Sequence, residues 1–145
     1  KVKGTNKNYS YRGTDFKDKI DLGKGDDVLN GKGGNDVLKG GKGKDVFEFD
    51  TALGAGNVDT IKDFSPKDDS IHLSAAIFTG LDKGWLSAGA FVVGTAAADA
   101  DDRIIYNKKT GALSFDADGS GSGAAVQFAK LSKGLDVSAD DFFVF

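Results

Sequence analysis

The chain has 145 residues, enough for one domain with a buried core, and its 19 Lys and Arg against 22 Asp and Glu leave a net charge of −3. The lack of cysteine excludes disulfides, thiolate metal sites and cysteine nucleophiles, and the single histidine, His72, excludes metal sites built on two histidines. No apolar run reaches the ~18 residues of a membrane-spanning helix. The acidic balance and the lack of an aromatic-plus-basic platform argue against nucleic acid as a partner. Because the sequence begins at Lys1 rather than at a methionine, we expect it to be part of a longer protein.

The first third of the sequence repeats with a period of nine residues. Each repeat has an aspartate, and these are Asp18, Asp27, Asp36 and Asp45. Two positions after each aspartate stands a large apolar residue, and these are Ile20, Leu29, Leu38 and Phe47. The nonapeptides are GTDFKDKID (13–21), LGKGDDVLN (22–30), GKGGNDVLK (31–39) and GGKGKDVFE (40–48). They share the pattern G-G-x-G-x-D-x-U-x, in which U is apolar, although Thr14 and Phe16 replace glycines in the first copy.

This pattern predicts a stack of short strands joined by tight turns. The three residues x-U-x form a strand whose middle side chain points inward, and six glycine-rich residues reverse the chain. Such turns aim backbone carbonyls at one point, and the aspartate adds a carboxylate, a set of oxygens that suits Ca²⁺. Two nonapeptides make one turn of a flattened right-handed roll, with Asp18 and Asp36 on one edge and Asp27 and Asp45 on the other. Without calcium these stacked carboxylates repel, so we expect that segment to be loose or unfolded.

A flexible linker rich in Gly, Lys and Asp is the plain alternative. A linker has no reason to keep four aspartates and four apolar residues in one frame over 36 residues. The sequence therefore favours the calcium-binding roll.

The repeats resemble those of the RTX, or hemolysin-type, calcium-binding proteins. Residues 46–74 contain FEF, NVDTIKDF and DSIHL, which are similar to the segment that closes the roll in serralysin-type proteases, with Asn57 in place of a glycine. Residues 103–131 and the ending DFFVF (141–145) also resemble the C-terminal region of these exported proteins. The resemblance implies an all-β fold, a right-handed parallel β-roll capped by antiparallel strands. It also implies export from a bacterium through the type I secretion machinery and folding on calcium in the extracellular space.

We expect one RTX domain over 1–145, with calcium-binding repeats at 13–48, a β cap at 49–135 and an ending similar to a secretion signal at 136–145. Two to four calcium ions are expected. The expected carboxylate ligands are Asp18, Asp27, Asp36, Asp45, Asp59 and Asp63, the last two with solvated strand-end acids as the alternative. The resemblance assigns backbone ligands to the loop glycines Gly23, Gly25, Gly31, Gly33, Gly34, Gly40, Gly41 and Gly43.

The function predicted from these features is a calcium-binding module that stabilises or delivers a larger exported protein. No catalytic constellation is evident, so we expect no enzymatic activity from these residues. A second hypothesis is a module that binds an acidic polysaccharide, since Lys19 and Lys39 stand at outward strand positions and the RTX modules of mannuronan epimerases look similar; lysines that only confer solubility are the alternative. We expect Trp85 to pack over the end of the roll, and His72 to be exposed and without a catalytic role.

Overall fold

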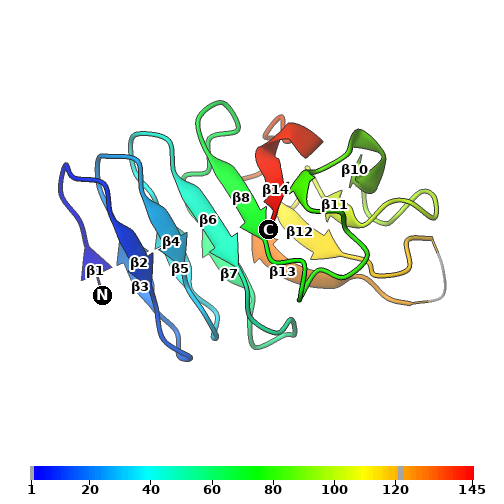
Figure 1. Ribbon diagram of the computed structural model, residues 1–145, viewed down its shortest axis with the longest axis horizontal. Coiled ribbons are helices and arrows are strands. Elements are labelled where there is room, and N and C mark those ends of the chain that lie inside the picture. The colour runs from blue at the N-terminus through cyan, green and yellow to red at the C-terminus, as the bar shows by residue number, and fades with distance from the viewer. Residues whose placement is uncertain (1, 121–122) are drawn as a thin grey trace.

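Two stacked parallel sheets form one end of the molecule and run into a smaller cap at the other (Figure 1). The computed structural model describes residues 2–120 and 123–145. The first sheet has eight strands in the order β1 (Val2–Lys3), β3 (Lys19–Asp21), β5 (Val37–Lys39), β7 (Asp59–Ile61), β13 (Val126–Lys130), β12 (Ala112–Phe115), β11 (Ile104–Tyr106) and β10 (Phe91–Val93). The second has six in the order β2 (Ser10–Arg12), β4 (Val28–Asn30), β6 (Val46–Phe49), β8 (Ser70–Leu73), β14 (Phe142–Val144) and β9 (Gly84–Trp85). The all-β prediction of a parallel β-roll capped by antiparallel strands is confirmed.

Two short 3₁₀ helices, η1 (Ala88–Ala90) and η2 (Ala139–Asp141), interrupt the cap. None of the helices in the described ranges has the length and apolar character needed to cross a membrane.

The roll is held together by rows of apolar side chains between its two sheets. In the first sheet Ile20 lies opposite Leu38, which lies opposite Ile61. In the second sheet Leu29 lies opposite Phe47. The four apolar residues of the nonapeptides are completely buried, as the period of nine predicts. Each such burial contributes about 1.5–3 kcal/mol, which offsets part of the entropy cost of ordering a glycine-rich chain.

The roll extends beyond residues 13–48 in both directions. Upstream, residues 4–12 form a further degenerate turn in which Tyr9 stands in the aspartate position and Tyr11 lies opposite Leu29. Downstream, β7 and β8 continue the two sheets by pairing in parallel with β5 and β6. The sequence pattern misses the upstream turn because its residues keep the nine-residue spacing but only the first glycine, Gly4, and no aspartate.

The C-terminal strand β14 lies between β8 and β9 in the six-stranded sheet. It pairs in parallel with β8, where Phe142 lies opposite Ile71, and antiparallel with β9, where Phe143 lies opposite Trp85. A capping box between Ser138 and Asp141 sets the direction in which the chain enters the strand. The C-terminal residues are therefore an interior part of the sheet.

Candidate calcium-binding edges

The loops of the roll stack on two edges, and each edge holds a ladder of aspartates. We call first edge the loops 13–18, 31–36 and 50–59, and second edge the loops 4–9, 22–27, 40–45 and 62–69. On the first edge the amide of Asp18 donates to Oδ1 of Asp36 at 2.7 Å, and the amide of Asp36 donates to Oδ1 of Asp59 at 3.0 Å. The stacking places Asp18 and Asp36 on one edge, as the two-repeat turn predicts.

The second edge repeats this arrangement with one aspartate that the sequence analysis missed. The amide of Asp27 donates to Asp45, and the amide of Asp45 donates to Asp69, both at 3.0 Å. At the other end, the amide of Tyr9 donates to Asp27 at 2.8 Å. Asp69 carries the same Asp-x-apolar signal as the repeats, because Ile71 follows it and is buried. The break in the nine-residue frame concealed that signal.

Three ladder aspartates have a buried oxygen that lacks a hydrogen-bond partner among the described residues. These are Oδ2 of Asp27, Asp36 and Asp45, whose side chains are at most 1% exposed. A Cβ placed on Gly31 would lie 2.2 Å from Oδ2 of Asp36, and one on Gly40 would lie 2.3 Å from Oδ2 of Asp45. Because Gly31 and Gly40 have no side chain, the space beside Oδ2 of Asp36 and of Asp45 stays open. Buried unpaired carboxylate oxygens beside carbonyl-rich loops fit a hard cation such as Ca²⁺.

Burial raises the pKa of the aspartates along both edges. The pKa is raised to about 7 at Asp45, about 8 at Asp59 and about 6 at Asp69, and it is also raised at Asp27 and Asp36. Loss of water around each carboxylate is the main cause, and neighbouring aspartates on the same edge add to it. A divalent cation on each edge would remove this electrostatic cost.

The structure places Asp59 and Asp63 differently. Asp59 is buried within the ladder, whereas Asp63 accepts the amides of Gly40 at 3.1 Å and Gly41 at 2.7 Å. Asp63 therefore anchors the start of loop 40–45 through both of its oxygens. The expected backbone ligands also lie in the stacked loops, and those with positive φ are Gly23, Gly25, Gly34, Gly41 and Gly43. Gly33 lies against Asp15 of the preceding loop on the first edge.

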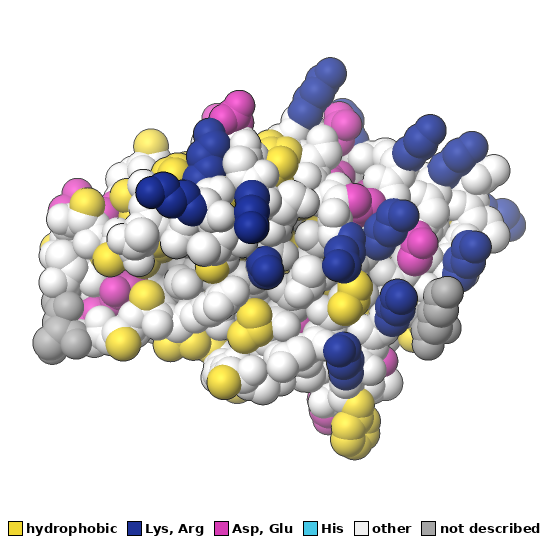
Figure 2. All heavy atoms as spheres, turned by 180° about the vertical axis from the view of Figure 1, so that it is seen from behind, with side chains coloured by type: hydrophobic (Ala, Val, Ile, Leu, Met, Phe, Trp, Pro, Cys, Tyr) yellow, Lys and Arg dark blue, Asp and Glu magenta, His cyan; other side chains and the backbone are white. Residues whose placement is uncertain are grey.

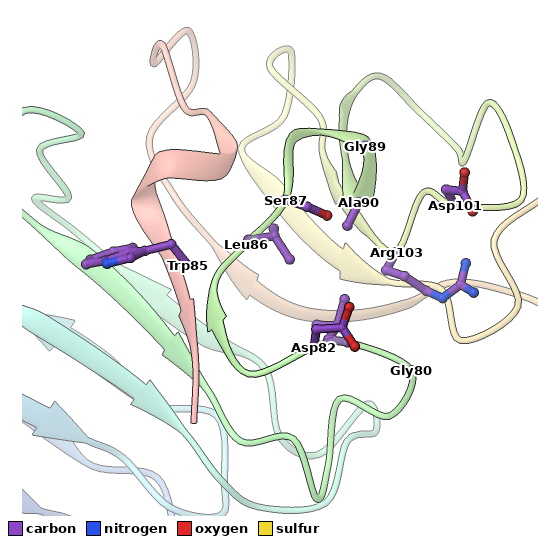
Figure 3. Close-up of a pocket in the computed structure, with 10 residues that line it drawn as sticks. Gly80, Asp82, Trp85, Leu86, Ser87, Gly89, Ala90, Asp101 and Arg103 are labelled. Atoms are coloured by element: carbon purple, nitrogen blue, oxygen red, sulfur yellow. The ribbon is translucent and has the colours of Figure 1, made fainter.

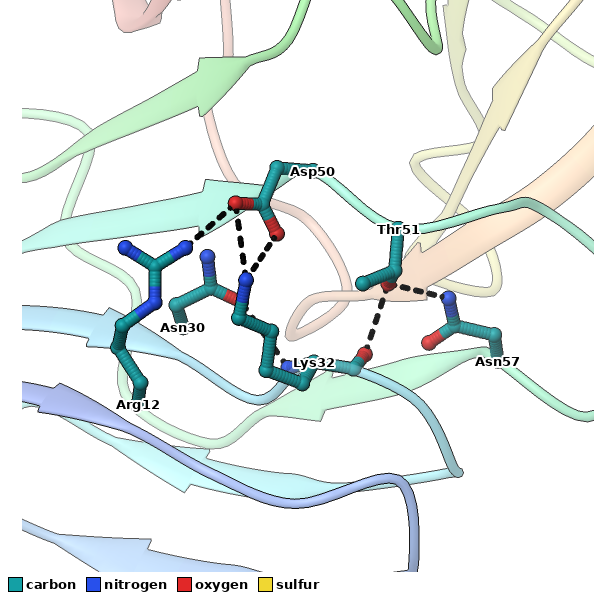
Figure 4. A network of polar contacts seen from close by, with 6 residues as sticks. All are labelled: Arg12, Asn30, Lys32, Asp50, Thr51 and Asn57. Atoms are coloured by element: carbon teal, nitrogen blue, oxygen red, sulfur yellow. Dashed lines mark hydrogen bonds and ion pairs between the residues drawn. The ribbon is translucent and has the colours of Figure 1, made fainter.

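Polar side chains clamp loop 31–36 to the next loop of the first edge (Figure 4). Asp50 accepts Nη2 of Arg12 at 2.7 Å and Nζ of Lys32 at 3.2 Å. Thr51 donates to the Lys32 carbonyl at 2.9 Å, and Asn57 donates to Thr51 at 2.8 Å. Lys32 is the one non-glycine residue with positive φ in the described chain, at 65°, so these contacts hold a backbone conformation that glycine would adopt more easily.

The expectation that Trp85 packs over the end of the roll is wrong. Its side chain is 62% exposed and lies against Phe143 and His72 on the outer face of the six-stranded sheet. Trp85 also lines a hollow of about 280 Å³ in the cap, together with Asp82 and Arg103. Figure 3 shows its indole pointing away from these two residues. The antiparallel pairing of β9 with β14 sends the side chain outward, which the local sequence does not reveal. His72 is half-buried between these aromatic rings.

Within residues 2–120 and 123–145, no three acidic or histidine side chains converge on one point that could hold a metal ion. The loops supply one carboxylate each, so the other ligands of a cation would be backbone carbonyls, which calcium accepts readily.

Comparison with known proteins identifies these loops. The family model of the RTX calcium-binding nonapeptide repeat matches residues 12–48 in four copies. Residues 12–48 are therefore a segment of RTX calcium-binding repeats. RTX repeat proteins are typically secreted bacterial proteins. The match includes Asp18 and the three aspartates with unpaired oxygens, whereas Asp59 and Asp69 extend the ladders of this RTX segment beyond it.

One similar solved structure covers nearly the whole chain. It is the solution structure of the AlgE6R3 subunit from the Azotobacter vinelandii mannuronan C5-epimerase. The similarity covers 96% of this RTX chain and 79% of that one, with 25% sequence identity and a TM-score of 0.31. No curated protein gives a significant sequence match.

Proposed function

We propose that this chain is a module that folds on binding calcium after export through a type I secretion channel, and that it stabilises or delivers a larger exported protein. The unpaired, buried carboxylate oxygens of the RTX loops carry this proposal. In the absence of cations the two edges hold stacked carboxylates in glycine-rich loops, which opposes folding. In this proposal the module itself performs no catalysis.

Calcium supplies charge neutralisation and oxygen coordination when it is bound, and the chain's own residues determine where. Oδ2 of Asp27, Asp36 and Asp45 would hold the ions together with carbonyls of the stacked loops. Extracellular calcium modules bind with dissociation constants of roughly 10⁻⁴–10⁻³ M. A site filled at 100 times its dissociation constant adds about 2.7 kcal/mol, so a few such sites decide whether a marginal domain folds.

A calcium titration followed by circular dichroism tests the proposal. Starting in chelator, the far-UV signal is expected to change cooperatively to that of a β protein at sub-millimolar to millimolar calcium, and equal magnesium is expected to have no such effect. Magnesium is the appropriate control because it keeps its water ligands and demands a regular octahedron. A spectrum that is already folded in chelator and does not respond to calcium would contradict the proposal.

The calcium requirement is expected to depend on pH. Burial raises the pKa of Asp45 to about 7 and of Asp59 to about 8 in the calcium-free fold, well above their values in an unfolded chain. Protons therefore stabilise the calcium-free fold at low pH, and that contribution is lost as the pH rises through 7 to 8. Calcium needs the same carboxylates charged, so it competes with protons. The midpoint of the calcium titration is expected to lie at higher calcium at pH 5.5 than at pH 8, and an unchanged midpoint would mean that no protonated, calcium-free fold competes with the calcium-bound one.

A second candidate function is binding of an acidic polysaccharide on the outer face of the eight-stranded sheet. The register places Lys39 beside Lys62 and Lys130 opposite Thr60, with Lys19 on the same face. All four lysines are exposed. Figure 2 shows this face from behind Figure 1, with Lys and Arg side chains spread over it and few acidic ones between them. Calcium on the edges would leave the basic charge of this face dominant.

Charge reversal on this face tests the second candidate. Lys39→Glu combined with Lys62→Glu is expected to abolish the binding of short alginate oligosaccharides at saturating calcium, measured by calorimetry at low ionic strength. Lys83→Glu, an exposed lysine in the cap, is the control and is expected to retain binding. Binding that is equal in both variants, or that does not weaken with added salt, would count against a polyanion site.

A further inference from the structure

Five of the six ladder aspartates fall into two groups according to their second carboxylate oxygen. The group in which the structure describes no partner for this buried oxygen consists of Asp27, Asp36 and Asp45. In the other group a backbone amide of the same loop occupies it. Oδ2 of Asp18 accepts the amide of Thr14 at 2.7 Å, and Oδ2 of Asp69 accepts the amide of Ser65 at 2.8 Å. Asp59 belongs to neither group, because it follows a longer loop of nine residues, 50–58.

The backbone four positions before each aspartate separates the two groups. In the first group this residue has positive φ, and these residues are Gly23 at 86°, Lys32 at 65° and Gly41 at 96°. The amide there is directed elsewhere, to Oδ1 of Asn30 from Lys32 and to Asp63 from Gly41. Thr14 and Ser65 do not have positive φ, and their amides turn back onto their own aspartates.

The position of the second group in the fold is consistent with this division. Asp18 belongs to the first loop of the first edge, and Asp69 belongs to the last loop of the second edge. A charged carboxylate held by an N–H group is satisfied without a cation. Three of the aspartates between these ends, Asp27, Asp36 and Asp45, have a buried oxygen for which only an added positive group would serve.

We propose that Asp27, Asp36 and Asp45 bind calcium, whereas Asp18 and Asp69 are ion-free caps that close opposite ends of the two ladders through backbone amides. This inference rests on the proposed calcium function and specifies which of its aspartates are ligands. The sequence analysis assigned Asp18 the same role as the other repeat aspartates, and the amide of Thr14 is the observation that separates it.

Counting bound ions in matched asparagine variants tests the division. Stoichiometry is measured by competition with a chromophoric chelator, with circular dichroism as the check on folding. Asp36→Asn is expected to bind at least one ion fewer than the unmodified chain, while Asp18→Asn and Asp69→Asn are expected to bind the same number. Loss of an ion in Asp18→Asn or Asp69→Asn would overturn the division. If the unmodified chain bound no calcium, the proposed function itself would fail, which is a separate outcome.

A variant that gains a calcium ion provides a second test, because poor folding cannot produce a gain. Thr14→Gly combined with Phe16→Gly restores the glycines of the nonapeptide pattern in loop 13–18, so the amide of residue 14 is free to turn away from Asp18. This variant is expected to bind one additional ion, and the gain is expected to vanish when Asp18→Asn is added. An unchanged ion count in the folded double variant would show that the backbone at position 14 does not control ligation.

Discussion

Gly41→Ala is expected to prevent the roll from reaching its full stability even at saturating calcium. A Cβ at this position would lie 1.6 Å from the carbonyl oxygen of Gly23 in the loop stacked beneath it. The same oxygen accepts the amide of Lys42 at 2.9 Å, so the clash falls on a hydrogen bond that joins the two loops. Gly41 also has φ of 96°, which costs an alanine about 1–2 kcal/mol before any overlap is counted. Together these effects are expected to lower the free energy of unfolding by about 4 kcal/mol or more.

The measurement is thermal unfolding in calcium, where such a loss corresponds to a midpoint about 10 °C lower or to no cooperative transition. Gly56→Ala is the matched control, because it has the same effect on the unfolded chain but its Cβ would meet nothing within 4 Å. That variant is expected to stay within about 0.5 kcal/mol of the unmodified chain. Equal midpoints for the two alanine variants would mean that the loops do not stack as described.

Asp45→Asn is expected to have opposite effects with and without calcium. In the calcium-free fold it removes a buried carboxylate whose pKa burial raises to about 7, so at pH 8 the variant is expected to need less of a stabilising osmolyte than the unmodified chain to fold in chelator. Asparagine has the same shape, and its oxygen can still accept the amide of Asp27. With calcium the variant lacks a charged ligand, and its midpoint is expected to rise at least tenfold, or about 1.4 kcal/mol.

Asp26→Asn separates the buried site from a simple change in net charge. Asp26 is the exposed neighbour on the same edge, and its Oδ1 accepts the amide of Lys44 at 2.7 Å, which asparagine can reproduce. Calcium titrations at pH 8 and osmolyte-induced folding in chelator, both followed by circular dichroism, are the two measurements. If Asp26→Asn shifted both quantities as far as Asp45→Asn does, the effect would be general electrostatics and Asp45 would not be a ligand.

The roll is predictable from sequence because its period is local. A strand of three residues and a turn of six are complete within one nonapeptide, so Leu38 and Phe47 are assigned to the core without knowledge of their partners. Asp69 and Tyr9 were missed for the opposite reason. Asp69 keeps the Asp-x-apolar signal but falls outside the nine-residue frame, and Tyr9 keeps the spacing without an aspartate, so only their stacking over 24 and 18 residues places them in the ladder.

The cap follows sequence patterns less closely. Leu113 and Phe115 are buried in alternation with less buried neighbours, but such alternation does not say which strand β9 will pair with. The exposure of Trp85 results from that pairing. The ligand assignment has the same limit, because Thr14 and Ser65 differ from Lys32 only in a backbone torsion that a residue type does not fix.

The position of β14 constrains the order in which the cap and the roll can fold. Phe142 pairs with Ile71, and the backbone of Phe145 is joined by hydrogen bonds to Leu73 and Ala75, about seventy residues away along the chain. Whichever end of the polypeptide emerges first from a ribosome or a pore, β8 and β14 cannot pair until both have emerged. The chain between β8 and β14 must close into a loop, at a cost in entropy, before the contacts between the two strands stabilise the fold. Completion of the six-stranded sheet is therefore expected to be a slow, late step of folding. Until then β8 presents an open edge, and an incomplete chain is the form most exposed to aggregation and proteolysis.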